Sequence, residues 1–568
     1  MRRSLVTTLV VIVLIMIGFA LYAARQHLAN HSVLVLELEG DLEEAPPLDL
    51  LSQLSARGPS LPTLLLLLDM AAADSRIDGV LVHVKALSLG YGRLQELRDA
   101  LAAVRAANKQ IVVLIDGTSL NGTRELFLAS VANKVLVDPG SLAPLAGVAG
   151  QYLQLGGLFE KLGVKWEYSR IGKYKSAVEQ FGARRMSPEA RENAEGIVDG
   201  VFAQLVDGVA QGRKLSGEKV RALFESVPGT PQELVAAGLA DEIAGRKEAL
   251  EKGGLHGTTE VEAADYQRFD PKSLGLRSGP RIALVFGDGA IVGSRTRSYS
   301  RQFAADEVEK ALDAAAEDDE IRAVVFRVNS PGGDSQASDR VWRAVRRVRE
   351  KKPVVISMAD YAASGGYYVA SAANAIVAQP ATITGSIGVL MLRPNFAGAL
   401  EKLEIGHTSI TRGGPYAGML AGDAPMTPEQ RERTDAFTKA AYDTFLSRIH
   451  EGRGTPTERA DELGRGRVWL GSDALANNLI DELGGLATAV ARARKEAKLE
   501  DEPDPVRVIL PAPQGPMQQL RSILRGESSH RLLQALSPVE LPSLAPLEWL
   551  ASTSGGIAYL PAVWLELR

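Results

Sequence analysis

The chain has 568 residues, no cysteine and a formal net charge of −5. The lack of cysteine excludes disulfides, thiolate zinc sites and cysteine nucleophiles. The nearly balanced charge gives no basis for nucleic-acid binding, which typically needs a basic patch. The seven histidines are scattered without metal-ligand spacing, so we expect neither a metal nor a cofactor.

The first predicted element is a membrane anchor at residues 4–24, SLVTTLVVIVLIMIGFALYAA, which carry no charge. A helix of this length spans the hydrocarbon core of a bilayer, about 30 Å. A cleaved signal peptide is the alternative, but its apolar region is usually about 7–15 residues long and ends in small residues. This chain has Leu21 or Tyr22 where a small residue is needed. Arg2 and Arg3 predict a cytoplasmic N-terminus, with the rest of the chain on the other side of the membrane.

The remainder of the chain repeats itself. The stretch 127-FLASVANKVLVDPGSLAPLAGV-148 reads like 368-YVASAANAIVAQPATITGSIGV-389, and further matches follow in the same order at a near-constant offset. Such self-similarity indicates two copies of one domain. The predicted divisions are a first repeat at 31–255, a linker at 256–280, a second repeat at 281–498 and a tail at 501–568.

Each repeat begins with a β-branched run, 33-VLVLELEG-40 or 282-IALVFGD-288, and continues with helical stretches that alternate with strands. This alternation predicts βαβ units and a largely parallel sheet. We therefore expect an α/β fold, with ligand sites beyond the carboxyl ends of the strands.

A candidate nucleophile lies in the second repeat, within 359-ADYAASGGYYVA-370. This stretch follows a strand predicted at 353–358, and small residues flank Ser364 on both sides, which would expose its hydroxyl to a substrate. The first repeat has Thr123 at the matching position, followed by charged residues in place of glycines. A serine needs an activating base, and no His or Asp close in sequence supplies one.

The loop 328-VNSPGGD-334 follows the strand predicted at 323–328. Its paired glycines can aim backbone N–H groups at a developing negative charge, which is what an oxyanion hole requires. The matching loop of the first repeat, 84-VKALSLG-90, lacks both the proline and the paired glycines. The alternative is that the loop is only a tight turn.

The candidate base lies in the first repeat, within 169-SRIGKYKSAVEQF-181, where Lys175 matches Tyr416 of the second repeat. One repeat thus keeps the serine and the other keeps the lysine, which a single site built across both repeats explains. A Ser–Lys pair is a known alternative to the Ser–His–Asp triad. In the alternative reading, Lys175 is a surface lysine that forms a helical ion pair with Glu179.

A lysine acts as a base only when it is neutral. At its ordinary pKa of about 10.4, roughly one lysine in 2,500 is neutral at pH 7. Burial away from water lowers a lysine pKa. We therefore expect Lys175 to be desolvated and Glu179 to point elsewhere.

At these residues the sequence resembles the S49 peptidases, in particular the long, two-repeat signal peptide peptidase A type of bacteria. The stretches that carry the resemblance are 171-IGKYKSAVEQF-181, 328-VNSPGGD-334, 360-DYAASGGYYVA-370 and 384-TGSIGV-389. The resemblance implies a Clp protease/crotonase-like fold, a repeated ββα spiral, behind the N-terminal transmembrane helix. It further implies roles for individual residues: Ser364 as nucleophile, Lys175 as general base, Ser386 as the serine that orients the lysine, and Gly332, Gly333 and Gly365 as oxyanion candidates.

The resemblance also implies the setting of the reaction. Its substrates would be signal peptides left after secretion, and four chains would assemble into a bowl. The catalytic domains would lie on the periplasmic side of the bacterial inner membrane. Lys173, two residues before the proposed base, is the control position in 173-KYK-175.

Two other function classes fit parts of the sequence. Crotonase-like acyl-CoA chemistry also uses backbone N–H pairs to hold an oxyanion, but it needs neither a membrane anchor nor a serine at position 364. A non-enzymatic membrane scaffold would explain the repeats and the anchor, but not the retained serine and lysine.

Overall fold

The computed structural model describes residues 28–45, 58–295, 301–511 and 558–559. The predicted anchor at 4–24 lies outside the described residues. Within the part of the chain that the structure describes, no helix has the length and apolar character needed to cross a bilayer.

The first repeat contains a parallel sheet in the order β6-β4-β3-β2-β1-β7. Its central strands are buried on both faces and therefore consist of nearly continuous apolar runs, as in β1 and β3. The strands are β1 (Ser32–Gly40), β2 (Ile77–Leu87), β3 (Gln110–Ile115), β4 (Lys134–Val137), β6 (Glu242–Ile243) and β7 (Thr259–Glu262). The helices are α3 (Leu61–Ala73), α4 (Tyr91–Ala106), α5 (Thr123–Ala129), α6 (Gly156–Leu162), α7 (Glu179–Gly182), α8 (Pro188–Arg213), α9 (Gly217–Ser226), α10 (Pro231–Ala236) and α11 (Ala249–Lys252), with the 3₁₀ turn η1 (Ser176–Val178).

The second repeat has a matching, mostly parallel sheet in the order β17-β15-β13-β11-β8-β19, with β14 paired to β13 and β18 paired to β14. Its strands are β8 (Arg281–Asp288), β11 (Ile321–Ser330), β13 (Val354–Ala363), β14 (Ala375–Ala378), β15 (Ile383–Gly385), β17 (Val468–Leu470), β18 (Glu482–Leu483) and β19 (Val506–Leu510). The helices are α13 (Ala305–Glu317), α14 (Ser335–Arg349), α15 (Gly365–Ala370), α16 (Ala397–Lys402), α17 (Pro428–Arg453), α18 (Thr457–Leu463), α19 (Gly471–Ala476) and α20 (Leu486–Glu496).

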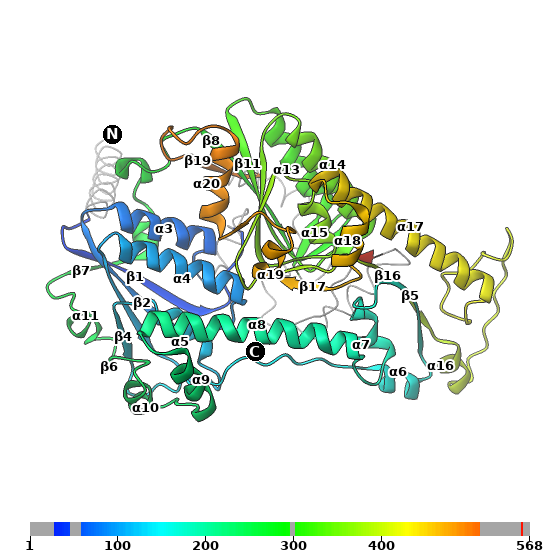
Figure 1. Ribbon diagram of the computed structural model, residues 1–568, viewed down its shortest axis with the longest axis horizontal. Coiled ribbons are helices and arrows are strands. Elements are labelled where there is room, and N and C mark those ends of the chain that lie inside the picture. Colours follow the sequence, from blue (N-terminus) through cyan, green and yellow to red (C-terminus); the bar gives the residue numbers. More distant parts are fainter. Residues whose placement is uncertain (1–27, 46–57, 296–300, 512–557, 560–568) are drawn as a thin grey trace, which may run out of the picture.

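Two long helices show the internal repeat directly. Helices α8 and α17 are both 26 residues long and occupy matching positions in the two repeats. Each begins with a proline after a hydroxyl N-cap, Ser187 or Thr427, whose side chain accepts a hydrogen bond from a backbone N–H of the first turn. In Figure 1, α8 runs along the lower side of the molecule from α5 towards α7.

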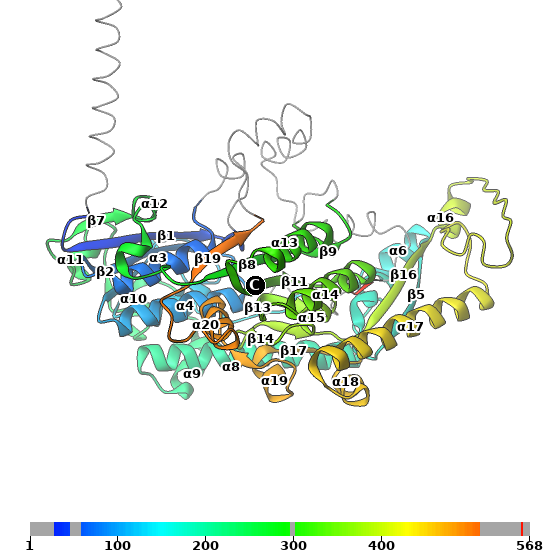
Figure 2. The same cartoon turned by 90° about the horizontal axis from the view of Figure 1, so that it is seen from above.

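A third sheet joins the repeats, in the order β10-β9-β12-β20-β16-β5. Strand β5 (Lys165–Ile171) of the first repeat pairs antiparallel with β16 (Val389–Asn395) of the second, from Lys165 opposite Asn395 to Ile171 opposite Val389. Figure 2 shows this pair at one end of the molecule, next to α16 and α17. The remaining strands are β9 (Ala290–Val292), β10 (Gln302–Ala304), β12 (Gly333–Asp334) and β20 (Ala558–Tyr559). The sequence after β5 is thereby carried to the second repeat.

The two repeats also share a buried core. Val325 and Val355, on one face of the second sheet, belong to the same apolar cluster as Leu94 and Leu97 of α4 in the first repeat. The segments outside the predicted repeats pack on these sheets as well. Residues 256–280, predicted as a linker, supply β7, α12 (Ala263–Tyr266) and η2 (Pro271–Leu274), and the start of the predicted tail supplies β19 beside β8.

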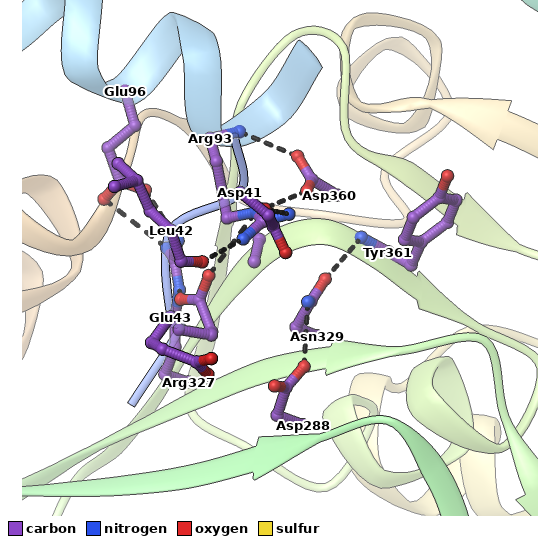
Figure 3. Close-up of polar contacts among 12 residues, drawn as sticks. Asp41, Leu42, Glu43, Arg93, Glu96, Asp288, Arg327, Asn329, Asp360 and Tyr361 are labelled. Carbon is purple, nitrogen blue, oxygen red and sulfur yellow. Dashed lines mark hydrogen bonds and ion pairs between the residues drawn. The ribbon is translucent and has the colours of Figure 1, made fainter. Parts of the chain in front are cut away.

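Buried ion pairs hold the repeats together (Figure 3). Arg327 of β11 is 1% exposed and donates to Glu96 of α4 at 2.6 Å and to Glu44 at 2.5 Å. Arg93 of α4 pairs with Asp360 of β13 at 2.5 Å, and its backbone N–H donates to the same carboxylate at 2.8 Å. Burial raises the pKa of Glu44 to about 7, against the opposing effect of the two arginines. The network fixes β11 and β13 to the first repeat.

Replacing Arg327 by alanine should lower the free energy of unfolding by about 3–5 kcal/mol, because it removes from the buried network the cation that contacts both Glu44 and Glu96. The matched control is Arg347→Ala, which removes an arginine that is half exposed and pairs with Asp313. It should cost about 1 kcal/mol or less. Urea denaturation of the full chain measures both, and equal losses would contradict an interlocking role for the buried network.

Candidate active site

Ser364 lies at the sharp junction between β13 and α15. Its backbone has φ +54° and ψ −113°, a conformation that L-residues rarely adopt, and its N–H donates to the Gly385 carbonyl at 2.8 Å. Such conformations cost about 1–3 kcal/mol and are concentrated at functional sites. A Cβ on the next residue, Gly365, would come within 2.6 Å of Ser338 Oγ, so the small residue is required by close packing.

Lys175 is delivered to the second repeat by the turn that follows β5. Its side chain is fully buried, and its Nζ lies 2.7 Å from Ser364 Oγ. The same Nζ lies 3.0 Å from both the hydroxyl and the carbonyl oxygen of Ser386. Burial holds the pKa of Lys175 well below its ordinary range. The amine contacts two hydroxyls and one carbonyl oxygen, and a neutral lysine can form hydrogen bonds with all three.

Glu179 and Lys173, two charged residues close to Lys175 in the sequence, make their contacts elsewhere. Glu179 accepts hydrogen bonds from Ser187 Oγ at 2.8 Å and from Arg170 at 3.1 Å, so it forms no helical ion pair with Lys175. Lys173 lies over the Tyr174 ring, with its Nζ 4.7 Å from the ring centroid. Of the two lysines in 173-KYK-175, the structure brings Lys175 to the serine.

Ser386 lies in the turn after β15 with φ +52°. Its N–H donates to the Arg467 carbonyl at 2.7 Å, which fixes the turn, and its hydroxyl and carbonyl both face the lysine amine. The predicted supporting serine therefore contacts Lys175 through its backbone as well as its side chain, a contact that the sequence does not reveal.

The two loop glycines differ in their contacts. The N–H of Gly332 donates to Ser330 Oγ at 3.2 Å. The nitrogen of Gly333 lies 3.2 Å from the position that a Cβ on Gly365 would occupy. A Cβ on Gly333 itself would come within 2.2 Å of the Ile291 carbonyl oxygen, so only glycine fits there. The structure thus brings the backbone of Gly333 next to that of Gly365.

The matching position of the first repeat is occupied by contacts within that repeat. Thr123 Oγ1 accepts a hydrogen bond from the Gly147 N–H at 2.9 Å. Glu125, which replaces the second glycine, accepts one from the Leu87 N–H at 2.6 Å. At this position the first repeat thus uses its side chains for contacts within its own fold.

Sequence reasoning did not identify the segment 464-GRGR-467, which contacts the turns of both Lys175 and Ser386. A signal was available, because two arginines alternate with two glycines directly before a strand. It also did not identify β20, which lies between β12 and β16. Within the described residues, no group of His, Asp or Glu side chains is arranged to hold a metal ion.

Comparison with known proteins identifies the family. The model of peptidase family S49 matches residues 103–255 and 346–500, one match in each repeat. The chain belongs to peptidase family S49. It is 34% identical over 518 residues to "Serine protease SPPA, chloroplastic" of Arabidopsis thaliana, covering 89% of this chain and 74% of that protein. It is 30% identical over 499 residues to "Protease 4" of Salmonella typhi, covering 84% and 78% of the two chains.

This S49 peptidase is therefore a serine peptidase with a mixed α/β fold in two repeats, as the resemblance of its motifs predicted. The acyl-CoA and scaffold alternatives do not account for this family membership.

Proposed function

We propose that this protein is an endopeptidase with a Ser–Lys dyad split across its two repeats. The observation that carries the proposal is the 2.7 Å contact between the Nζ of a fully buried Lys175 and the Oγ of Ser364. That distance is within the reach required of a base and its nucleophile. Ser386 orients the amine from the other side.

In the proposed reaction, Ser364 Oγ attacks the scissile carbonyl carbon and its proton passes to neutral Lys175 Nζ. The leaving amine then takes that proton as the peptide bond breaks, which leaves an ester on Ser364. A water molecule attacks the ester and gives its proton to Lys175, and the proton returns to Ser364 Oγ as the acid product leaves. Each step uses the lysine first as base and then as acid.

We assign the oxyanion hole to the N–H groups of Gly333 and Gly365. Backbone donors that are fixed before the reaction stabilise the negative charge that develops on the carbonyl oxygen. The adjacency of these two glycines supports the choice, and the hydrogen bond from the Gly332 N–H to Ser330 Oγ counts against Gly332.

The proposed substrates are signal peptides and other apolar peptides, bound in extended form. Strand β20 supports this mode because it pairs antiparallel with β12 at Gly333 and with β16 at Leu390, directly beside the proposed oxyanion hole. A substrate strand in the same place would gain backbone hydrogen bonds from both neighbours. Ala177, Val178 and Leu390 form an apolar cluster there, which favours apolar side chains.

The pH dependence of the rate tests the lysine as base. Because the pKa of Lys175 is depressed and the neutral amine is the active form, kcat/KM for an apolar fluorogenic peptide should rise with pH through the depressed pKa. It should reach a plateau well below the ordinary lysine pKa of about 10.4. The Ser364→Ala variant supplies the background rate. A rate that rises without inflection up to about pH 10 would contradict a desolvated lysine base.

We further propose that residues 4–24 anchor the enzyme in the bacterial inner membrane with its catalytic domains in the periplasm. The uncharged length of this segment and the arginines before it support that arrangement. Externally added protease should digest the catalytic domains in spheroplasts, and domains protected until the membrane is dissolved would contradict it.

A homo-oligomer, a tetramer by family resemblance, is also proposed. The second-repeat counterpart of the Lys175 turn projects apolar side chains into solvent, with Ile410 80% exposed. Leu120, three residues before the first-repeat counterpart of the nucleophile, is 88% exposed. Within one chain, the Lys175 turn of the first repeat meets the Ser364 site of the second repeat. If the turn around Ile410 met the region around Leu120 of another copy in the same way, both exposed apolar surfaces would be covered. Light scattering after size exclusion should give a multiple of the monomer mass, and a monomer at all concentrations would contradict this.

A further inference from the structure

A short segment of the second repeat lies against both turns that form the lysine environment. In 464-GRGR-467, the carbonyl of Arg465 accepts a hydrogen bond from the Tyr174 N–H at 2.9 Å. The carbonyl of Arg467 accepts one from the Ser386 N–H at 2.7 Å. The segment therefore links the residue before Lys175 to the serine that contacts the lysine amine.

Gly466 brings this segment into direct contact with the backbone of Lys175. Its φ is +81°, and a Cβ there would lie 2.3 Å from the backbone nitrogen of Lys175. Gly172, with φ +106°, approaches from the other side, since its Cβ would lie 2.2 Å from the Arg465 carbonyl carbon. Two glycines thus allow the two backbones to touch, and any larger residue would push the lysine turn away.

The Arg467 side chain continues the contact onto Tyr174. Its guanidinium carbon lies 4.2 Å from the centroid of the Tyr174 ring, and it donates to the tyrosine hydroxyl and to Glu192. Tyr174 is buried, and its hydroxyl also lies 3.1 Å from the Glu192 carboxylate. The residue before the base is therefore held by both stacking and hydrogen bonds.

The first repeat shows that this arginine is not needed to build the turn. There, the N–H of Leu145 donates to the Pro228 carbonyl at 3.0 Å, the same backbone contact that Ser386 makes with Arg467. Leu145 matches Ser386 at the repeat offset of 241. The offset of 240 between α10 and α19 matches Val227 to Arg467, so the acceptor Pro228 lies one residue further along, and neither residue is an arginine. The arginine is present in the second repeat, where the serine contacts the lysine amine. The first repeat keeps a backbone contact of this kind without an arginine.

We propose that Arg467 is a positioning residue for the general base. Its guanidinium holds Tyr174, and so sets where the Lys175 amine lies relative to Ser364, while the backbone carbonyl at this position holds Ser386 whatever the side chain. This inference rests on the proposed Ser–Lys dyad. Arg467 does not touch the reacting atoms in the structure, so the effect of its side chain is exerted through Tyr174.

Arg467→Ala in the full chain should lower kcat on an apolar fluorogenic peptide by about 10- to 100-fold, because small displacements of a catalytic group are costly. KM should change by less than about threefold, since the residue binds no substrate. The inflection of the pH–rate profile should move to higher pH, as a less confined amine regains solvent. Arg467→Lys, which keeps a cation near the Tyr174 ring, should lose less. Arg459→Ala, an exposed arginine that pairs with Glu462, is the matched control.

A double-mutant comparison separates positioning from general stability. If Arg467 acts through Tyr174, adding Tyr174→Phe to Arg467→Ala should lower kcat no further than Arg467→Ala alone. Fully additive losses of kcat in the double mutant would overturn the proposal while leaving the dyad intact. The same holds if Arg467→Ala has an unshifted pH profile and a kcat equal to that of the Arg459→Ala control. Cleavage that persists in Ser364→Ala or Lys175→Ala would instead show that the dyad itself is wrong.

Discussion

Replacing Ser364 by alanine should abolish peptide cleavage, with kcat reduced by at least about 10³-fold, because no other group takes over a lost nucleophile. The strained backbone of Ser364, the adjacent glycines and the lysine amine at 2.7 Å all converge on its hydroxyl. The variant should fold normally, since alanine differs only by the loss of that hydroxyl. Cleavage of an apolar fluorogenic peptide measures the effect.

The control for this change is Ser447→Ala, which removes an exposed hydroxyl on α17 that pairs with Glu451. It should retain full activity. If Ser364→Ala kept more than a small fraction of the wild-type rate, Ser364 would not be the nucleophile, and the contact with Lys175 would have only a structural meaning.

Lys175→Ala and Lys175→Arg should both reduce kcat by at least about 10³-fold. Alanine removes the proton acceptor. Arginine keeps a positive charge but cannot be deprotonated in a protein, so it cannot act as base. The two variants together distinguish proton transfer from simple electrostatic stabilisation.

Lys173→Ala is the matched control two residues away. Lys173 only lies over the Tyr174 ring, so its loss should cost no more than a few-fold in kcat. An active Lys175→Arg enzyme, or a Lys173→Ala enzyme as inactive as Lys175→Ala, would refute the assignment of the base.

The sequence was sufficient to predict that Ser364 and Lys175, from different repeats, lie next to each other in the fold. The internal repeat allowed each position to be compared with its counterpart, and the two repeats had lost opposite members of the pair. The α/β repeats followed from strands that alternate with helices, because a buried parallel strand needs an apolar run that is easily recognised. The family comparison confirmed the repeats and the peptidase activity.

The contacts that dock the repeats could not be predicted. The β5–β16 pairing and the contact of Arg93 with Asp360 join residues far apart in the chain, and no local pattern marks such partners. Short strands such as β7 carry too few residues to show a period, so the predicted linker gave no sign that it would join the first sheet. Arg467 looked like an ordinary charged residue because its role depends on a tyrosine from the other repeat.

The most direct test of a single site built across two repeats is to locate the covalent adduct of a fluorophosphonate probe by mass spectrometry and to measure how fast it forms. The wild-type chain should carry the probe on Ser364. The adduct should form at least about 10³-fold more slowly in Lys175→Ala, although that lysine lies in the other repeat. An adduct on a different serine, or labelling of Ser364 at the same rate without Lys175, would contradict the account.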